Sequence, residues 1–187
     1  TSSPTYVADH NMVVTNNSYT NANAGCPGEG AYDVVSNYVD KQMGDYEKLL
    51  HVFAAGNDGA LTCSPFPIKY ATIKSGYQVA KNVITVGALD TLYAAASFSS
   101  RGPVNDGRLK PEIMASGLNT LSTRHNFTYG TSSGTSMASP IVAGAATLLN
   151  EQYRKFNAGA LPQAALIKAL LCNTAEDLGN PGPDFTY

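Results

Sequence analysis

The chain has 187 residues, the size of one ordinary domain, and its 12 basic and 14 acidic residues give a formal charge of −2. Charged residues make up only 14% of the sequence, and no cluster of Lys or Arg marks a nucleic-acid footprint or a polybasic membrane patch. Hydrophobic residues at 43% are enough for a core, which excludes a disordered tail. No apolar run approaches the roughly 20 residues that a membrane span needs.

Strands and helices are predicted to alternate along the chain. Short apolar or β-branched runs predict strands at residues 12–15, 49–55, 82–89 and 112–115. Near-helical spacing of apolar or small residues predicts helices at residues 31–43, 138–156 and 162–174. Because strands alternate with helices, the sequence predicts an α/β fold with a largely parallel sheet.

Each helix is expected to pack through one face. In the first helix this face consists of Val34, Val35, Tyr38, Val39 and Met43. In the last helix it consists of Ala165, Leu166, Ala169, Leu170 and Cys172. The long middle helix is expected to begin at or next to Ser136 and to bury residues 137–144, because small residues there permit close packing. Pro140 fits this helix only in the first turn, where its missing N–H breaks no hydrogen bond.

The three cysteines show no C-x-x-C spacing, so neither a zinc ribbon nor a redox motif is predicted. Cys26 and Cys63 both lie in loops rich in Gly, Pro and Ser, the usual setting of a disulfide in a secreted protein. Cys172 lies in an apolar helical run and is expected to be a buried, inert thiol.

The segment GTSMASP at residues 134–140 runs directly into the long helix. A serine at a helix N-terminus lies beside unpaired backbone N–H groups and the positive end of the helix dipole. Those donors can stabilise the oxyanion that develops when a serine attacks a carbonyl. Taken alone, the segment favours Ser136 or Thr135 as an ordinary N-cap residue, because that is the commonest role of Ser and Thr at such a position.

A second segment, AAGNDG at residues 54–59, follows a predicted buried strand. Ligands of open α/β sheets bind at the carboxyl ends of strands. The side-chain amide of Asn57 could there donate to a developing negative charge, while the glycines allow a substrate backbone to approach. An ordinary Asn-Asp-Gly turn is the plainer interpretation.

Taken together and in this order, the two segments resemble the subtilisin family of serine peptidases. GTSMASP with the following IVAGAATLL is similar to the family's nucleophile motif, and AAGNDG is similar to its oxyanion-hole motif. The segments SFSSRGP and KPEIMASG resemble the stretch between them in larger subtilases. The resemblance implies a subtilisin-like α/β fold, with helices on both faces of a mostly parallel sheet.

Residue by residue, the resemblance makes Ser136 the nucleophile and Asn57 the oxyanion donor. The resemblance also implies two walls of a substrate-binding pocket. The first wall consists of Asn16, Asn17 and Ser18, after the first strand, and the second wall, opposite it, consists of Ala54, Ala55 and Gly56. Thr135, just before the nucleophile, is implied to bind substrate as well. The chain departs from the family at Ser116, where Pro is usual, and at Tyr19 and Thr20, where Gly residues often follow the serine. Cys26 and Cys63 follow the two walls, so their loops are expected to be neighbours.

The rest of the catalytic triad is missing from the sequence. The family's order is Asp, then His, then Ser, in Asp-Thr/Ser-Gly and His-Gly-Thr segments, and neither pattern occurs here. His10, His51 and His125 lack the family's flanking residues, so none is expected within hydrogen-bond reach of Ser136. Residues 1–187 are therefore interpreted as the C-terminal part of a single catalytic domain, with the acid and the base upstream. Such a chain alone is expected to be practically inert.

Other functions remain as alternatives. The sedolisin group of acid peptidases shares a similar Ser-Gly-Thr-Ser signature but has Asp at the oxyanion position, so Asn57 favours the subtilase side. A pseudo-peptidase or binding module would keep the fold without the triad, and the presence of both Ser136 and Asn57 argues against that loss. A phosphate loop is excluded at residues 130–136, because no Gly-Lys-Ser/Thr follows.

The resemblance also implies partners and a location. We expect a polypeptide substrate, an upstream segment of the same protein carrying Asp and His, and a secreted or cell-surface site of action. No nucleic acid, membrane span, metal ligand set or cofactor is identified, and a structural calcium ion is left open.

Overall fold

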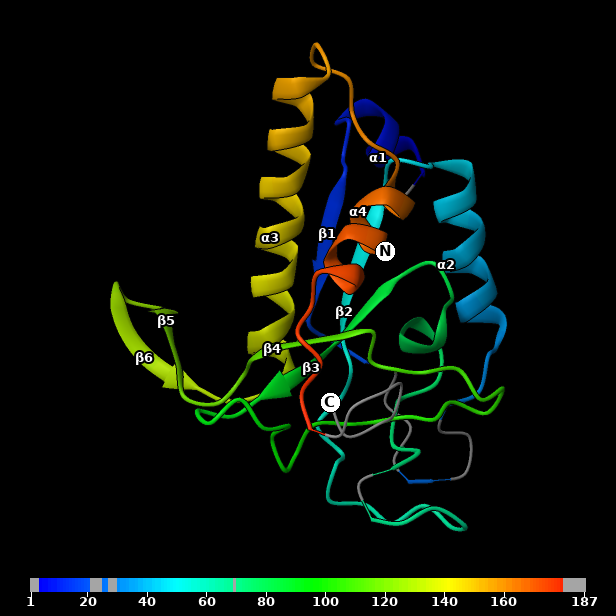
Figure 1. Cartoon of the computed structure of the whole chain (residues 1–187), viewed down its shortest axis with the longest axis vertical. Coiled ribbons are helices and arrows are strands. Elements are labelled where there is room, and N and C mark those ends of the chain that lie inside the picture. Colours follow the sequence, from blue (N-terminus) through cyan, green and yellow to red (C-terminus); the bar gives the residue numbers. More distant parts are fainter. Residues whose placement is uncertain (1–3, 21–24, 27–29, 69, 180–187) are drawn as a thin grey trace.

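A four-stranded parallel sheet forms the centre of the computed structural model, which describes residues 4–20, 25–26, 30–68 and 70–179. Its strands are β1 (Val14–Asn17), β2 (Leu50–Ala54), β3 (Ile84–Leu89) and β4 (Ile113–Ser116), in the order β1-β2-β3-β4 (Figure 1). Every residue of β2 and β3 is buried, which explains why both read as continuous apolar runs. The predicted α/β class with a parallel sheet is confirmed.

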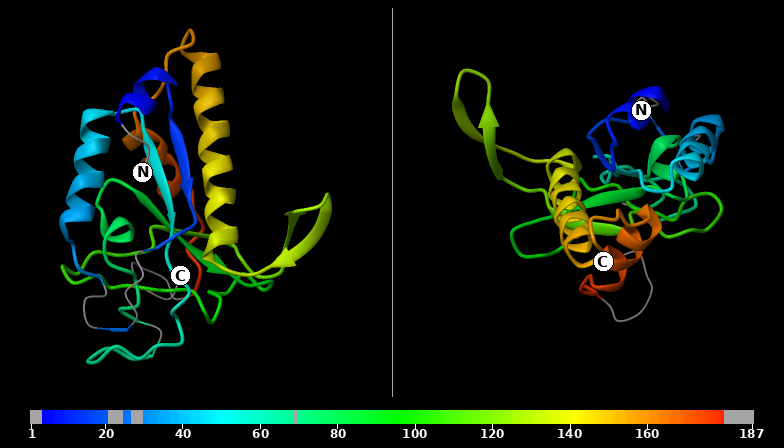
Figure 2. Two further views of the ribbon diagram at one scale, coloured as in Figure 1. Left: turned by 180° about the vertical axis from the view of Figure 1, so that it is seen from behind. Right: turned by 90° about the horizontal axis from the view of Figure 1, so that it is seen from above.

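Helices cover both faces of this sheet (Figure 2). On one face lie α3 (Thr135–Phe156), which contacts all four strands, and α4 (Ala164–Asn173). On the other face lie α2 (Val34–Asp45) and the short 3-10 helix η1 (Tyr77–Val79). None of the helices in the described part of the chain is long and apolar enough to cross a bilayer.

The first strand begins and ends two residues later than predicted. Polar residues Asn16 and Asn17 belong to β1 because Asn17 is buried and its side-chain amide donates to the Val52 carbonyl of β2 at 3.2 Å. The sequence predicts the end of the strand at Thr15, where the run of apolar and β-branched residues ends. The prediction therefore missed this end of the strand, because hydrogen bonds rather than apolar contacts hold it in the sheet.

The buried face of α2 differs from the predicted one. Val34 and Tyr38 are 82% and 50% exposed, whereas Val39 and Met43 are buried as predicted. The remaining inward positions carry polar groups: Ser36 donates to the Gly76 carbonyl at 2.6 Å, and Gln42 contacts His51. A hydrophobic pattern misses a helix face whose contacts are hydrogen bonds.

The rotation of α4 was also predicted wrongly. Its buried residues are Ala164, Ile167 and Leu171, while the predicted stripe is largely exposed and Cys172 is half-buried rather than buried. Both faces of α4 are apolar, so the hydrophobic pattern cannot choose between them. Lys168 makes the difference, since its ammonium donates to the carbonyls of Lys81 and Val83 at 2.9 and 2.7 Å. Burial raises the pKa of the Cys172 thiol, which keeps it protonated.

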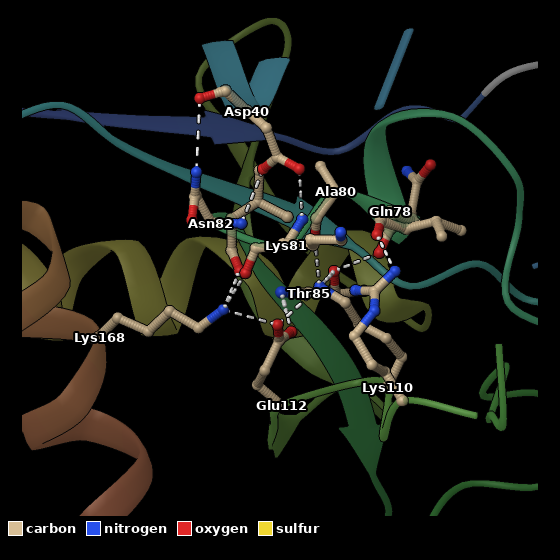
Figure 3. Close-up of polar contacts among 12 residues, drawn as sticks. Asp40, Gln78, Ala80, Lys81, Asn82, Thr85, Lys110, Glu112 and Lys168 are labelled. Carbon is tan, nitrogen blue, oxygen red and sulfur yellow. Dashed lines mark hydrogen bonds and ion pairs between the residues drawn. The ribbon is translucent and has the colours of Figure 1, made fainter. Parts of the chain in front are cut away.

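A buried ionic network joins α4 to the sheet (Figure 3). Lys110 and Lys168 both donate to Oε1 of Glu112, at 2.6 and 2.8 Å, and Thr85 N–H donates to Oε2 at 2.8 Å. Burial lowers the pKa of Lys110 to about 8 despite the attraction of Glu112. Burial alone would raise the pKa of Glu112, but the two ammonium groups outweigh it and the pKa falls below its usual value.

The long helix begins at Thr135, so the prediction that it begins at or next to Ser136 is confirmed. Its small residues Ala138, Ala143 and Ala146 are buried on the sheet. Continuous burial of residues 137–144 was a wrong prediction, because Pro140, Ile141 and Gly144 are exposed. A helix lying across a sheet buries one stripe, not every position.

Two further elements were not predicted. The helix α1 (Pro4–Asp9) precedes β1, and β5 (Thr120–Arg124) pairs antiparallel with β6 (Thr128–Ser132). This hairpin projects from the body of the molecule (Figure 2) and is mostly exposed on both faces, so it lacks a buried apolar alternation. The predicted disulfide is confirmed: Cys26 and Cys63 are bonded, with their Cα atoms 5.2 Å apart.

Candidate active site

Three segments far apart in the sequence meet at one end of the sheet. Ser18 follows β1, Asn57 follows β2, and Ser136 is the second residue of α3. Since β1 and β2 are parallel neighbours, their carboxyl ends lie side by side, and the N-terminus of α3 meets both (Figure 1). The residues that the sequence singled out for the nucleophile and the oxyanion donor are therefore brought together.

The side chain of Asn57 is oriented by the start of α3. Its Oδ1 accepts from the Thr135 N–H at 2.9 Å and lies 3.1 Å from the Thr135 hydroxyl. Because the oxygen is used as an acceptor, the amide nitrogen Nδ2 is the donor left over. No hydrogen bond within the described residues uses Nδ2, and Asn57 is exposed. The arrangement leaves one N–H donor group next to the residue that precedes Ser136.

Thr135 is buried between the two motifs. Its hydroxyl accepts from the Gly56 N–H at 3.2 Å and can donate either to the Gly56 carbonyl or to Asn57. Gly134, at φ +153°, precedes it, and a Cβ there would lie 3.5 Å from Asn57 Nδ2. That distance is an ordinary van der Waals contact, so the requirement for glycine comes from the backbone conformation, which other residues rarely adopt.

Ser136 is tied to Ser18 by two hydrogen bonds. The Ser136 hydroxyl donates to the Ser18 carbonyl at 3.4 Å, a long contact, and the Ser18 hydroxyl donates to the Ser136 carbonyl at 3.0 Å. Pro140 explains the second bond. It lies in the second turn of α3, not in the first as predicted, and has no N–H for the carbonyl four residues earlier. Ser18 supplies the donor that the helix lacks.

The helix end also leaves backbone donors. The first four N–H groups of an α-helix have no partner within the helix. Here Thr135 N–H donates to Asn57 and Met137 N–H donates to the Gly134 carbonyl, whereas the Ser136 N–H has no partner among the described residues. Ser136 thus has its own amide and the positive end of the dipole of α3 beside its hydroxyl.

The side chains of the first wall are bonded to other parts of the chain. Asn16 Oδ1 accepts from the Ser139 hydroxyl at 2.6 Å, which ties β1 to α3. Asn17 is buried and bonds to Thr15, Val52 and the Tyr19 hydroxyl. Asn16 is nevertheless exposed, and its Nδ2 donates to the Ser18 hydroxyl at 3.2 Å. A role of Asn17 in substrate binding would involve its main chain, because its side chain is buried.

The second wall is fixed by its neighbours in the sheet. The Ala54 carbonyl accepts from the side chain of Gln78 at 3.1 Å, and Ala55 N–H donates to the Val86 carbonyl at 2.9 Å. Gly56 has φ +116°, and a Cβ there would lie 2.8 Å from the Ser100 hydroxyl. Glycine is required here by both the backbone conformation and the close approach.

Hydrogen bonds in the described part of the chain join neither a histidine nor a carboxylate to Ser136. His51 is buried in β2, where Nδ1 lies 2.6 Å from the Thr15 hydroxyl and Nε2 lies 3.2 Å from Gln42 Oε1. Burial lowers the pKa of His51 to about 4. Both of its ring nitrogens are thus engaged within the core, which suits a structural role. Within the same residues, no group of three His, Cys, Asp or Glu side chains is arranged to hold a metal ion.

Three contributors to this region were missed at the sequence level. Ser139 bonds to Asn16, Pro140 frees the Ser136 carbonyl, and Ser100 contacts the turn that carries Asn57. Ser100 lies in the SFSSRGP segment, and Ser139 and Pro140 lie in GTSMASP. Membership of a motif was the available signal, but nothing in the sequence indicates the contact that each residue makes.

Comparison with known proteins identifies relatives of this chain. A model of the subtilase family matches residues 2–187. Serine protease AprX of Bacillus subtilis is 41% identical over 120 residues, which cover 53% of this chain and 25% of that protein. Subtilisin DY of Bacillus licheniformis is 37% identical over 132 residues, which cover 69% of this chain and 40% of that protein.

Among solved structures, the patellamide maturation protease PatA matches with a TM-score of 0.71. Its identity of 24% makes this a likeness of fold, which extends over 97% of this chain and 59% of the PatA chain. The chain spans less than half the length of the two curated relatives named above. With a family model that matches nearly every residue, the chain belongs to the subtilase family.

Proposed function

We propose that the protein is a serine endopeptidase in which Ser136 attacks the peptide carbonyl and the Asn57 amide stabilises the resulting oxyanion. The observation that carries this proposal is the hydrogen bond from Thr135 N–H to Asn57 Oδ1 at 2.9 Å. It orients the amide so that Nδ2 is left as a donor beside the nucleophile. Such fixed donors, aimed where negative charge develops, contribute strongly to acyl-transfer catalysis.

The chain supplies only part of this mechanism. The base that takes the Ser136 proton and the acid that orients it are proposed to lie upstream, because neither family pattern occurs in residues 1–187. A serine hydroxyl without a base is a weak nucleophile at neutral pH. In subtilisin itself, removing the base is known to lower kcat by about 10⁶, with roughly 10³ to 10⁴ over water remaining. Residues 1–187 are accordingly proposed to be the C-terminal part of one catalytic domain and to be inert alone.

The substrate is proposed to be an extended polypeptide held between the two walls. The backbone of Asn16, Asn17 and Ser18 would lie on one side of it, and that of Ala54, Ala55 and Gly56 on the other, with Thr135 behind. The burial of Asn17 and Ala55 supports main-chain recognition, because their side chains are not free to meet a ligand. The primary pocket is expected to be narrowed by Tyr19 and Thr20.

The protein is proposed to act outside the cell or at its surface. The Cys26–Cys63 disulfide supports this location, because disulfides persist mainly in oxidising compartments. No cofactor enters the proposed mechanism, since a hydroxyl nucleophile, an amide donor and a base suffice for peptide hydrolysis.

Hydrolysis of casein by the full-length protein tests the proposal. Ser136→Ala should lower kcat by about 10⁶, whereas Ser133→Ala, an exposed serine three residues earlier, should leave it unchanged. Asn57→Ala should lower kcat by about 10² to 10³, the loss known for the side-chain oxyanion donor of subtilisin. Residues 1–187 alone should not cleave casein. A folded full-length protein that binds peptides without cleaving them, or a Ser136→Ala variant that keeps its activity, would overturn the proposal.

A further inference from the structure

Ser100 contacts the turn that carries Asn57 on both sides of that residue. Its N–H donates to the Gly56 carbonyl at 3.0 Å, and its hydroxyl accepts from the Asp58 N–H at 3.1 Å. Ser100 is fully buried, and its bond to the Asp58 N–H is part-buried. One residue, 43 positions away in the sequence, thus bonds to both neighbours of Asn57.

The two bonds fix the backbone angles of Asn57. The Gly56 carbonyl belongs to the peptide plane that precedes the Asn57 Cα atom, and the Asp58 N–H belongs to the plane that follows it. A residue whose two flanking peptide planes are held has little freedom left in φ and ψ. Because the Cα–Cβ direction follows from these planes, Ser100 determines where the Asn57 side chain starts.

Neighbouring contacts hold the rest of the turn, whereas the backbone of Asn57 itself makes no hydrogen bond among the described residues. Gly59 N–H donates to the Phe98 carbonyl at 2.8 Å, and the Asp58 carboxylate pairs with the largely buried ammonium of Lys74 at 3.1 Å. The Ser100 hydroxyl fits against Gly56 because that residue has no side chain. The described hydrogen bonds of the Asn57 side chain reach only Thr135. Thr135 therefore sets the rotation of the amide, and the two peptide planes set where the side chain begins.

We propose that Ser100 is a positioning residue of the oxyanion site, acting on the reaction through Asn57 without touching the substrate. This inference rests on the proposed function and extends it to the residue that sets the direction of the donor. Loss of the Ser100 hydroxyl leaves the Asp58 N–H without its acceptor, so the following peptide plane can turn. The amide donor then moves away from the position where the oxyanion forms.

Ser99 offers a matched control. It is also fully buried, and its hydroxyl also accepts from a backbone N–H, that of Ala88 in β3, at 3.0 Å. Replacing either serine by Ala removes one buried side-chain acceptor of a backbone N–H. Only Ser100 has its acceptor on the turn that carries Asn57, so a merely structural effect should appear equally in both variants.

The test measures kcat and KM for a polypeptide substrate in the full-length protein. Ser100→Ala should lower kcat roughly tenfold with KM changed less than about twofold, since a small misplacement of a catalytic group is enough for such a loss. The loss must stay below the roughly 10² to 10³ expected for removing the Asn57 amide. Ser99→Ala should leave kcat within about twofold of the parent protein, apart from any loss of folded material seen by circular dichroism.

A double substitution separates positioning from other effects. In an Asn57→Ala background, Ser100→Ala should lower kcat no further, because no amide is left to misplace. A full additional loss in that background, or equal effects of Ser99→Ala and Ser100→Ala, would overturn the inference. If Asn57→Ala and Ser136→Ala themselves left hydrolysis intact, the proposed function would fail instead.

Hydrogen exchange gives a second readout in case Ser100→Ala does not fold. In the unsubstituted protein, the Asp58 amide should exchange slowly although it follows the exposed Asn57. Exchange of that amide at the rate of an unprotected peptide would show that Ser100 does not hold the plane, and would likewise refute the inference.

Discussion

Lowering the pH from 7 to 4 is expected to destabilise the chain through His51. The ring is fully buried in β2, and its Nε2 faces Gln42 Oε1, which can only accept. Nε2 therefore carries the proton, and Nδ1 accepts from the Thr15 hydroxyl, whose oxygen already accepts from Asn17. Both contacts suit a neutral ring. Burial accordingly lowers its pKa to about 4.

The magnitude follows from the difference between the folded and unfolded pKa values. In the unfolded chain the imidazole has a pKa of about 6.5, so between pH 6.5 and pH 4 the unfolded state binds more protons than the folded state. Stability is fully present above pH 6.5 and falls as the pH drops. With about 1.4 kcal/mol per pKa unit, His51 should lower the free energy of unfolding by about 3 kcal/mol at pH 4.

Urea unfolding followed by circular dichroism between pH 7 and pH 4 measures this effect. His51→Gln should reduce the fall in the free energy of unfolding between pH 7 and pH 4. His125→Gln, in the exposed turn of the β5–β6 hairpin, should leave that pH dependence unchanged. NMR titration of the ring protons gives the folded pKa of His51 directly. A ring that titrates near pH 6.5 in the folded chain, or a His51→Gln variant with the original slope, would refute the reasoning.

Three further outcomes are expected. Lys168→Met removes a cation from Glu112 and should lower the free energy of unfolding in urea by about 2 kcal/mol. Lys155→Met, which breaks an exposed ion pair, should lower it by less than about 0.5 kcal/mol. Equal losses in the two variants would contradict the idea that burial makes the Glu112 contacts strong. Reducing the disulfide, whose cysteines are 37 positions apart, should cost about 3–4 kcal/mol, and an unchanged urea midpoint would exclude this. Pro140→Ala supplies a backbone N–H at position 140 that can donate to the Ser136 carbonyl within α3, and should raise the free energy of unfolding by up to about 3 kcal/mol. A lower melting temperature of this variant in calorimetry would contradict the expectation.

The fold class could be predicted because β2 and β3 are buried along their whole length, are mostly apolar apart from His51 and Thr85, and alternate with helices. The helix faces could not, because Ser36 and Gln42 of α2 are buried by hydrogen bonds that leave no hydrophobic signal. In α4 the hydrophobic signal is equal on both sides. There the contacts of Lys168 with carbonyls 85 and 87 positions away decide the rotation.

The candidate site was predictable only as two motifs. Asn57 and Ser136 could be singled out because each follows or begins a core element, and the resemblance to subtilases connected them. Ser100, which lies between them in the sequence, could not be predicted as part of the site for a physical reason. Ser100 contributes a backbone N–H and a hydroxyl, and nearly every serine has both, so its contacts with Gly56 and Asp58 exist only in the folded chain.

The order of the segments along the chain bears on when the proposed activity can arise during synthesis. Ser18 and Asn57 emerge from the ribosome well before Ser136, and the contacts that join them to α3 span 118 and 78 positions. Domains generally fold as units, once their long-range partners are available. A nascent chain that ends before α3 therefore has the oxyanion turn but no nucleophile. The proposed peptidase activity therefore cannot arise before α3 has left the ribosome.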